Sequence, residues 1–337
     1  MNKSHNFWLN LWYKKSKWVY LLLPLSCLFS AVSSLRKFFL IQFTQQSVAV
    51  PVIIVGNISL GGTGKTPLII ALVKFLQQQG QKPGVVSRGY GGKVAHYPLL
   101  LDDNTCAQES GDEPLLIFNA TRCLVCVAPD RVAAAKMLVA QGCSIILSDD
   151  GLQHYRLARD LEIAVVDGLR LFGNNRLLPA GPLRESTSRL KTVDFVVVNN
   201  PPQLLALVGG VSYFSMQIKP SAWRKLQDQQ IIPLAKLPFE KKLHAVAGIG
   251  NPQRFFNTLN ELKIVYTPHE FDDHYGFTKE DFSFLGEESV VMTEKDAVKC
   301  QAFAKKEWYS LVVNAELDAG FWRSLQERLN SLLSKKL

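Results

Sequence analysis

A glycine-rich stretch between two apolar segments carries the clearest chemical signal in the chain. The run at Val50–Val55 is typical of a strand and Leu68–Leu76 of a helix, and a P-loop holds nucleotide phosphates in that context. Lys65 would reach the β- and γ-phosphates, and the Thr66 hydroxyl would bind Mg²⁺. The strict pattern has glycine where this chain has Ser59, so an ordinary turn is the alternative. We favour nucleotide binding by Ser59, Leu60, Gly61, Gly62, Thr63, Gly64, Lys65 and Thr66.

A second candidate site is an apolar strand that ends in two carboxylates. Asp149 and Asp150 follow the run at Ile145–Ser148, and an acidic group there can hold Mg²⁺ or its water shell opposite Thr66. Gln153 would add another oxygen ligand. Asp-Asp-Gly is also a common turn sequence, but beside a P-loop the metal role is the favoured interpretation.

An aspartate and a histidine far apart in the sequence are weaker candidates. Asp112 precedes Pro114 and a helix-like segment, so the pattern alone favours a helix N-cap. His274 follows two aspartates in a loop, and a solvated loop before a helix is the simplest interpretation. The functional alternative is a carboxylate–imidazole pair across an interdomain cleft, in which His274 orients or tunes a base.

Two arginines lie in glycine-bearing loops that follow strand-like runs. Arg88 is followed by Gly89 and Tyr90, and Arg184 and Glu185 follow Gly181-Pro182-Leu183. A planar guanidinium suits phosphate better than a surface lysine does, but a solvated loop arginine is an equal interpretation. The segment Thr293–Asp296 would contact a nucleotide base or cap a helix.

These motifs need a scaffold that brings them to one edge. Between residue 50 and about residue 200, apolar runs alternate with helical patterns, and near-continuous Val, Ile and Leu indicate strands covered on both faces. We therefore predict an α/β fold with a P-loop NTPase-like, doubly wound, mostly parallel sheet, whose ligands lie at the carboxyl ends of the strands. The expected strands are Val50–Val55, Gly84–Ser87, Cys123–Ala128, Ser144–Ser148, Leu161–Val166 and Phe195–Asn199.

The remainder of the chain predicts a second, smaller α/β domain. Val211–Ile218 alternates like an exposed edge strand, and Ser221–Pro238 resembles a connector. A strand–turn–helix pattern then restarts, with strands at Leu243–Ala247, Ser289–Thr293 and Trp308–Val313 and a helix at Gln253–Leu262. We divide the chain into an N-terminal membrane-associating segment (1–46), a P-loop core (47–210), a linker (211–240) and a C-terminal domain (241–337).

The bulk composition limits the partners. A chain of 337 residues exceeds one minimal domain, and its net charge of +9 suggests a phosphorylated ligand, an anionic membrane surface or nucleic acid. No aromatic–basic interleaving or zinc-finger spacing supports nucleic acid, and no obligate protein partner is inferred. Cys123 and Cys126 have a C-x-x-C spacing inside a strand-like run, which would turn them to opposite faces and favours burial over zinc. Scattered cysteines fit a reducing compartment.

The segment Trp18–Leu35 is free of charge and has cations on both sides. About 20 apolar residues span a bilayer, so this segment, with Pro24 and four serines, is at the short limit. A spanning helix, a cleaved signal peptide, an interfacial helix and a core helix are the alternatives. We favour the interfacial helix over the core helix because an aromatic belt accompanies the lysines: Trp8, Trp12, Tyr13, Trp18 and Tyr20.

Taken together and in this order, six motifs resemble the tetraacyldisaccharide 4′-kinases, the lipid A 4′-kinases of Gram-negative bacteria. The resemblance covers nearly the whole chain, including the apolar N-terminal segment. The motifs are Val55–Pro67, Ser87–Gly91, Gly111–Pro114, Asp149–His154, Gly181–Glu185 and Asp273–His274.

The resemblance implies transfer of the γ-phosphate of ATP to the 4′-hydroxyl of a tetraacylated glucosamine disaccharide 1-phosphate, which gives lipid IVA. It implies an enzyme at the cytoplasmic face of the bacterial inner membrane, where this acceptor and a lipid surface meet. The acyl chains would explain the apolar N-terminus, and the 1-phosphate fits the positive net charge.

The resemblance also implies roles for single residues. Asp112 is expected to be the base near the acceptor hydroxyl, with His274 modulating it, which reverses the helix-cap interpretation. Lys65 and Arg184 are expected to neutralise charge on the transferred phosphate. The implied ligands of Mg²⁺ are Thr66, Asp149, Asp150, Gln153 and Glu185, and the residues assigned to substrate binding are Arg88 and Tyr90.

Two rival functions remain at this stage. A membrane-associated P-loop ATPase or GTPase switch of the partitioning type has a similar loop but usually carries lysine where this chain has Leu60. A membrane-attached nucleotide-binding scaffold would leave Asp112 and His274 without a task.

Overall fold

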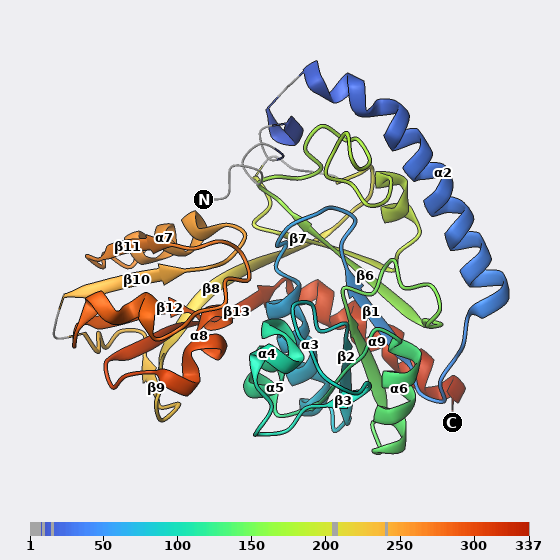
Figure 1. Ribbon diagram of the computed structural model, residues 1–337. Coiled ribbons are helices and arrows are strands. Elements are labelled where there is room, and N and C mark those ends of the chain that lie inside the picture. The colour runs from blue at the N-terminus through green and yellow to red at the C-terminus, as the bar shows by residue number, and fades with distance from the viewer. Residues whose placement is uncertain (1–7, 9–10, 15–16, 204–207, 240–241, 337) are drawn as a thin grey trace.

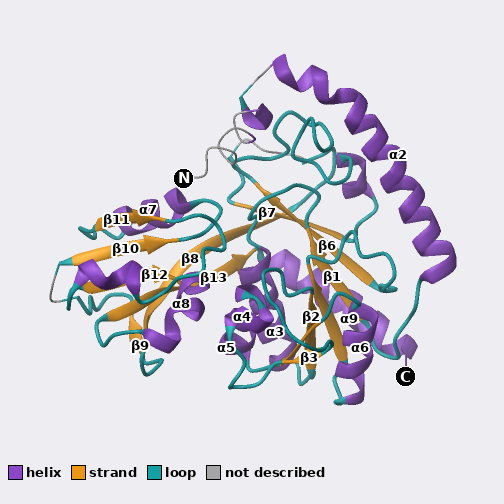
Figure 2. Cartoon of the chain, in the orientation of Figure 1, coloured by secondary structure: helices purple, strands orange, loops and turns teal. Residues whose placement is uncertain are grey.

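One mixed sheet extends through the whole molecule in the computed structural model, which describes residues 8, 11–14, 17–203, 208–239 and 242–336 (Figures 1 and 2). Within these residues the sheet has 13 strands, in the order β11-β10-β12-β13-β8-β7-β6-β1-β5-β2-β4-β3, and β9 pairs with β8. The sheet therefore joins the N-terminal half to the C-terminal half without a break.

The N-terminal half is the expected doubly wound unit. Its parallel strands are β1 (Val52–Gly56), β2 (Pro83–Ser87), β4 (Leu124–Val127), β5 (Ile145–Asp149), β6 (Leu161–Asp167) and β7 (Phe195–Asn199), with the antiparallel strand β3 (Leu99–Leu100) beside β4. All six predicted strands are confirmed to within one or two residues, because burial on both faces selects continuous apolar runs.

Helices cover both faces of this half. One face packs against α3 (Lys65–Gln78), α5 (Asp112–Thr121), which follows the short α4 (Ala107–Ser110), and the C-terminal helix α9 (Ala319–Lys336). The other face packs against α6 (Arg131–Ala140) and against the loops that follow β5 and β6. Cys123 and Cys126 are buried within this core, as predicted.

The C-terminal half continues the sheet through two long strands. β8 (Phe214–Lys225) pairs parallel with β7 and antiparallel with β13 (Trp308–Leu317), and β9 (Ile231–Pro233) pairs with β8. The other elements are β10 (Leu243–Ala247), α7 (Pro252–Glu261), β11 (Thr267–Glu270), η4 (Glu280–Leu285), β12 (Ser289–Thr293), α8 (Glu294–Cys300) and η5 (Gln301–Phe303).

Two predictions for this region are wrong. The expected edge strand at residues 211–218 is an internal strand, and the expected connector at Ser221–Pro238 contains the second half of β8 and all of β9. Pro220 argued against a strand, because proline cannot donate a hydrogen bond to a neighbouring strand. In the structure it lies beside an irregularity in the β8–β13 register, where a missing N–H is tolerated. The domain limits stay a prediction, and the limit between residues 240 and 241 lies outside the described residues.

The N-terminal segment forms a long helical stretch on the outside of the molecule (Figure 1). It comprises η1 (Lys17–Leu22), α2 (Leu23–Phe39) and η2 (Leu40–Thr44), and by length and composition it is the one helix among the described residues that could cross a membrane. Its large apolar side chains are exposed, which excludes a core helix and supports association with a membrane: Leu21, Leu25, Leu28, Val32, Leu35, Phe38, Phe39 and Phe43.

Part of the predicted aromatic belt faces the protein instead. Trp18 and Tyr20 are exposed, but the Trp12 indole donates a hydrogen bond to the carbonyl of Pro179 at 3.0 Å and packs beside Leu11 and Val19. Indole N–H groups find a partner when they are partly buried, so Trp12 attaches the segment to the globular body.

Candidate functional site

The P-loop lies between the end of β1 and the start of α3. Gly61 and Gly64 have φ angles of 99° and 96°, a conformation that glycine adopts without steric cost. A Cβ on Gly64 would lie 2.7 Å from the Nδ2 of Asn199, which donates to the carbonyl of Thr63 at 3.1 Å. Asn199, at the end of β7, therefore holds the P-loop in place. Lys65 is the first residue of α3, where the N-terminal backbone amides favour anions.

Asp149, at the end of β5, is buried behind the loop. The hydroxyl of Ser87 donates to its Oδ2 at 3.2 Å, while its Oδ1 is buried without a hydrogen-bond partner. Burial raises the pKa of Asp149, and the negative charges of Glu113 and Asp150 raise it further. A bound cation would relieve this unfavourable environment.

Asp150 is the ionised member of the pair. Its carboxylate lies 3.4 Å from the Nζ of Lys65 and 2.8 Å from the Nη1 of Arg184. Burial alone would raise the pKa of Asp150, but the charges of these two cations outweigh it and hold the pKa well below the usual range. Its φ of 46° is unusual for a non-glycine residue, and Arg131, which the sequence did not suggest, donates to its carbonyl at 2.9 Å.

The loop that carries Arg184 and Glu185 is attached to the P-loop. The backbone amide of Arg184 donates to the carbonyl of Ile58 at 2.7 Å, and Leu60 donates to the carbonyl of Pro182 at 2.8 Å. The Nε2 of Gln153 donates to Glu185 at 2.7 Å. The structure thus brings Gln153, Arg184 and Glu185 together with Asp150, as the sequence analysis expected.

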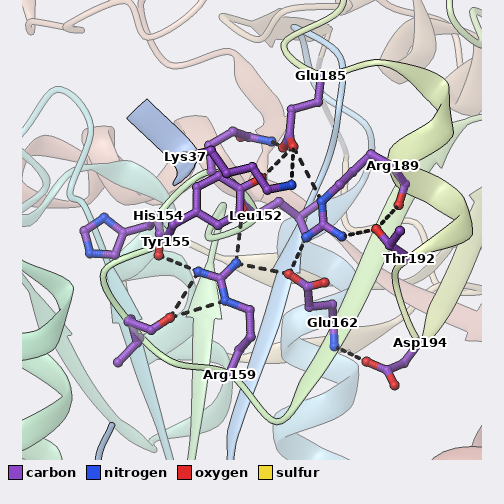
Figure 3. A network of polar contacts seen from close by, with 12 residues as sticks. Lys37, Leu152, His154, Tyr155, Arg159, Glu162, Glu185, Arg189, Thr192 and Asp194 are labelled. Atoms are coloured by element: carbon purple, nitrogen blue, oxygen red, sulfur yellow. Dashed lines mark hydrogen bonds and ion pairs between the residues drawn. The ribbon is translucent and has the colours of Figure 1, made fainter. Parts of the chain in front are cut away.

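A network of ion pairs holds the loop after β5 and the loop with Glu185 in place (Figure 3). Glu162 accepts hydrogen bonds from both Arg159 and Arg189. Arg159 also donates to the carbonyls of Leu152 and His154 at 3.1 and 2.6 Å, next to the acidic pair. Arg189 lies 3.5 Å from Glu185. None of these three charged residues was predicted, although the Arg-x-x-Glu spacing that places Glu162 inside an otherwise apolar strand was a visible signal.

Asp112 and His274 meet across the two halves of the molecule. The Nδ1 of His274 lies 3.1 Å from the Oδ2 of Asp112, although 162 positions separate them. Gly111, not Asp112, is the N-cap of α5, so the helix-cap interpretation of Asp112 is wrong. The backbone φ of Gly111 is 84°, which glycine accepts. The Oδ1 of Asp112 accepts the backbone amide of Glu113 at 3.0 Å, while its Oδ2 contacts His274.

The electrostatics of this pair favour a charged carboxylate. Asp112 is 5% exposed, and burial would raise its pKa, but the hydrogen bond to His274 and the charge of Lys295 outweigh burial and lower the pKa. The same hydrogen bond raises the pKa of His274. The carboxylate of Asp112 is therefore ionised at neutral pH, the form that can receive a proton from a nearby hydroxyl.

Lys295 is a further site residue whose role the sequence left open. It lies in the first turn of α8, and its Nζ is 3.0 Å from Glu113, 3.8 Å from Asp112 and 3.6 Å from Asp273. Burial would lower the pKa of Lys295, but the negative charges of these three carboxylates outweigh burial and raise the pKa above its usual range, so Lys295 stays charged. Lys295 therefore compensates the negative charge that gathers around the Asp112–His274 pair.

The loop with Arg88 and Tyr90 borders the same pair. Tyr90 is 71% exposed, and its ring centroid lies 5.2 Å from that of His274. Arg88 is exposed and follows the end of β2. Both residues are accessible to a ligand that reaches the pair.

A second bridge joins the halves behind the P-loop. Asp167, at the end of β6, accepts a hydrogen bond from Arg170 at 3.0 Å and lies 3.2 Å from Arg254 of α7. Arg170 also donates to the carbonyl of Gly62 at 2.6 Å. The P-loop is thus connected to the C-terminal half through Asp167.

The donor set fits Mg²⁺ held jointly with phosphate. No group of three His, Cys, Asp or Glu residues among those the structure describes could hold a metal by itself. Mg²⁺ bound to nucleotides uses one or two protein carboxylates and keeps water and phosphate oxygens for its other ligands. The partnerless oxygen of Asp149, together with Thr66 in the first turn of α3, fits that mode.

A P-loop together with a buried, ionised carboxylate that contacts the other half of the molecule suits a reaction with a hydroxyl acceptor. A P-loop switch that hydrolyses nucleotide positions water and needs no such carboxylate from an interlobe contact. Fold and site together therefore define a P-loop kinase.

Comparison with known proteins gives the family. A sequence model described as "Tetraacyldisaccharide-1-P 4′-kinase" matches residues 18–330. The chain is 46% identical to the tetraacyldisaccharide 4′-kinase of Nitrosococcus oceani, over 98% of this chain and 96% of that protein. It is also 46% identical to the tetraacyldisaccharide 4′-kinase of Methylobacillus flagellatus, over the full length of both.

A solved structure agrees with this assignment. The crystal structure of LpxK from Aquifex aeolicus in complex with ATP has a TM-score of 0.78 and 26% identity, and the match covers 94% of this chain and 99% of that one. The chain therefore belongs to the tetraacyldisaccharide-1-P 4′-kinase family. It is an enzyme that transfers phosphate to an alcohol, and the alternative of a partitioning-type switch is not favoured.

Proposed function

We propose that this kinase transfers the γ-phosphate of ATP to the 4′-hydroxyl of tetraacyldisaccharide 1-phosphate and so forms lipid IVA. The observation that carries the proposal is the contact, at 3.1 Å, between the buried carboxylate of Asp112 and the half-buried imidazole of His274. The pair adjoins the nucleotide site, because the hydroxyl of Ser87 donates to Asp149 and the loop that follows Ser87 approaches Gly111, where an added Cβ would lie 2.7 Å from the carbonyl oxygen of Tyr90. A base beside a phosphate loop is what phosphoryl transfer to a hydroxyl requires.

The residues divide the work between donor and acceptor. Backbone amides from Ser59 to Thr66 bind the ATP phosphates, and Lys65 and Arg184 neutralise charge on the phosphate in transfer. Asp112 accepts the proton of the 4′-hydroxyl as its oxygen attacks the γ-phosphorus, and His274 holds the carboxylate in place. The ADP oxygen leaves on the opposite side.

Mg²⁺ fits the same site. Thr66, Asp149, Asp150, Gln153 and Glu185 would hold it directly or through water, in agreement with the partnerless oxygen of Asp149. When bound, it would neutralise charge on the β- and γ-phosphates. Asp150 lies 3.4 Å from Lys65, and on binding the metal its carboxylate would give up part of that contact to bind the ion.

A lipid acceptor agrees with the accessible residues beside the Asp112–His274 pair and with the exposed apolar face of α2. Arg88 and Tyr90 are accessible beside the Asp112–His274 pair and would contact the disaccharide phosphate. The exposed apolar side chains of α2 would enter the membrane surface, and the net charge of +9 favours an anionic bilayer. Since ATP is cytosolic, the enzyme would work at the cytoplasmic face of the inner membrane.

One assay tests the proposal. The full-length protein is incubated with γ-labelled ATP, Mg²⁺ and tetraacyldisaccharide 1-phosphate in detergent, and the label is followed. Transfer to the lipid is the expected result. Release to water would indicate an ATPase, and no turnover with retained ATP binding would indicate a scaffold; either result would overturn the proposal.

A further inference from the structure

The membrane-associated helix is attached to one loop of the globular body. Ser26 is buried on the inner side of α2, and its hydroxyl donates to the carbonyl of Leu177 at 2.9 Å and accepts from the amide of Ala180 at 3.0 Å. Arg176 lies over the Tyr20 ring, 5.5 Å from its centroid. Residues 176–180 therefore follow the helix closely.

The same loop reaches the P-loop on its other side. Leu183 pairs with Ser59 in an isolated bridge, and the amide of Leu60 donates to the carbonyl of Pro182 at 2.8 Å. The segment from Arg176 to Glu185 thus lies between α2 and the nucleotide loop. A change in how α2 is seated would act on that segment directly.

Lys37 connects α2 to the residues of the phosphate site through an ionic contact. It lies in the last turn of α2, and its ammonium group is 3.8 Å from Glu185 and 4.8 Å from the centroid of the Tyr155 ring (Figure 3). Tyr155 donates to the same oxygen of Glu185 at 2.6 Å. Cations beside a membrane usually extend toward the lipid headgroups, whereas Lys37 turns toward the protein.

The contacts of Glu185 lead from Lys37 to the phosphate site. Glu185 accepts from Gln153 at 2.7 Å, and the amide oxygen of Gln153 lies 3.4 Å from the Nη1 of Arg184. That same nitrogen donates to Asp150 at 2.8 Å. A displaced Glu185 would therefore displace groups that the reaction needs.

We propose that Lys37 is a positioning residue of the kinase: from the membrane helix it holds Glu185, and through Glu185 the Gln153–Arg184–Asp150 cluster. The inference rests on the proposed function and deepens it, because docking of the helix then becomes part of the catalytic centre. Loss of such an outer contact to a ligating carboxylate typically lowers activity by about 10- to 100-fold.

The test compares Lys37→Met, Lys37→Arg and Arg36→Met in the full-length protein, with saturating lipid substrate in detergent micelles. Arg36 is the matched control because it is the neighbouring cation of the same helix and is exposed. We expect kcat to fall about tenfold for Lys37→Met with little change in the lipid KM, and to recover to within about threefold for Lys37→Arg. Arg36→Met should keep the wild-type kcat in micelles, and the two Lys37 variants should sediment with anionic vesicles as the wild type does, because Lys37 turns toward the protein.

A double-variant cycle adds a readout that a purely structural role would not give. Tyr155→Phe removes another contact of the same Glu185 oxygen, which Arg189 also approaches at 3.5 Å. If Lys37 and Tyr155 position Glu185 as one unit, the combined Lys37→Met/Tyr155→Phe protein should lose less kcat than the product of the single losses. Equal losses for Lys37→Met and Arg36→Met, or a change confined to the lipid KM, would overturn the proposal. A wild-type protein that does not phosphorylate the lipid would instead overturn the proposed function, on which this one rests.

Discussion

Replacing Asp112 with asparagine tests the base most directly. The amide is nearly the same size, so the packing of a side chain that is 5% exposed is preserved. Its oxygen can still accept the backbone amide of Glu113, a contact of 3.0 Å that involves Oδ1. What is lost is the negative charge and the ability to take a proton from the acceptor.

The expected loss of rate follows from that role. A positioned base contributes about 10² to 10⁴ in rate, and Asp112 is too buried for bulk water to replace it, so we expect kcat to fall about 10³-fold. This corresponds to about 4 kcal/mol in the activation barrier. Lys295 keeps Glu113 and Asp273 as partners at 3.0 and 3.6 Å, so the free energy of unfolding should fall by no more than about 2 kcal/mol.

The assay measures label transfer to the lipid at saturating ATP and lipid, alongside urea unfolding. Asp273→Asn is the matched control, because Asp273 belongs to the same cluster but is more exposed and contacts Lys295 rather than the reacting hydroxyl. We expect that control to keep kcat within about tenfold of the wild type. If Asp112→Asn also stays within tenfold, Asp112 is not the base and the reasoning from its burial and its contact with His274 is refuted.

Three further predictions address the loop and the interlobe pair. Lys65→Ala should lower kcat by about 100-fold, since it removes a cation beside the phosphates; a normal kcat in the label-transfer assay would contradict this. Gly64→Ala should lower the free energy of unfolding in urea by about 1–3 kcal/mol, because the φ of Gly64 is 96° and an added Cβ would lie 2.7 Å from Asn199. Gly62→Ala should lower it less, because the position of its Cβ is open space. Equal losses of unfolding free energy would refute the steric argument. The stabilising contribution of His274 should depend on pH: its folded-state pKa is raised above 6.5, so the contribution is fully present below pH 6.5 and is lost as the pH rises through the folded-state pKa. The difference in unfolding free energy between wild type and His274→Gln should therefore shrink above pH 6.5, and a difference that grows there would be inconsistent with the direction of the shift.

Local patterns were sufficient for the nucleotide half of the fold. Six strands and the start of α3 at the P-loop follow from apolar runs and glycine positions, since burial on both faces and the steric demands of a tight turn act over a few residues. The same logic failed for β8. Pro220 and the half-polar residues around it resemble a connector until β7 and β13 are seen to pair on either side.

The sequence by itself predicted a nucleotide-binding loop that contains Lys65 and Thr66 and identified an apolar N-terminus, because each property lies in one contiguous segment. Local patterns favoured Asp112 as a helix cap, and only the tertiary structure gives the contacts of Asp112 with His274 and of Lys37 with Glu185. Those contacts join residues more than a hundred positions apart. Their distances depend on the order and twist of the whole sheet, which no local pattern of side chains specifies.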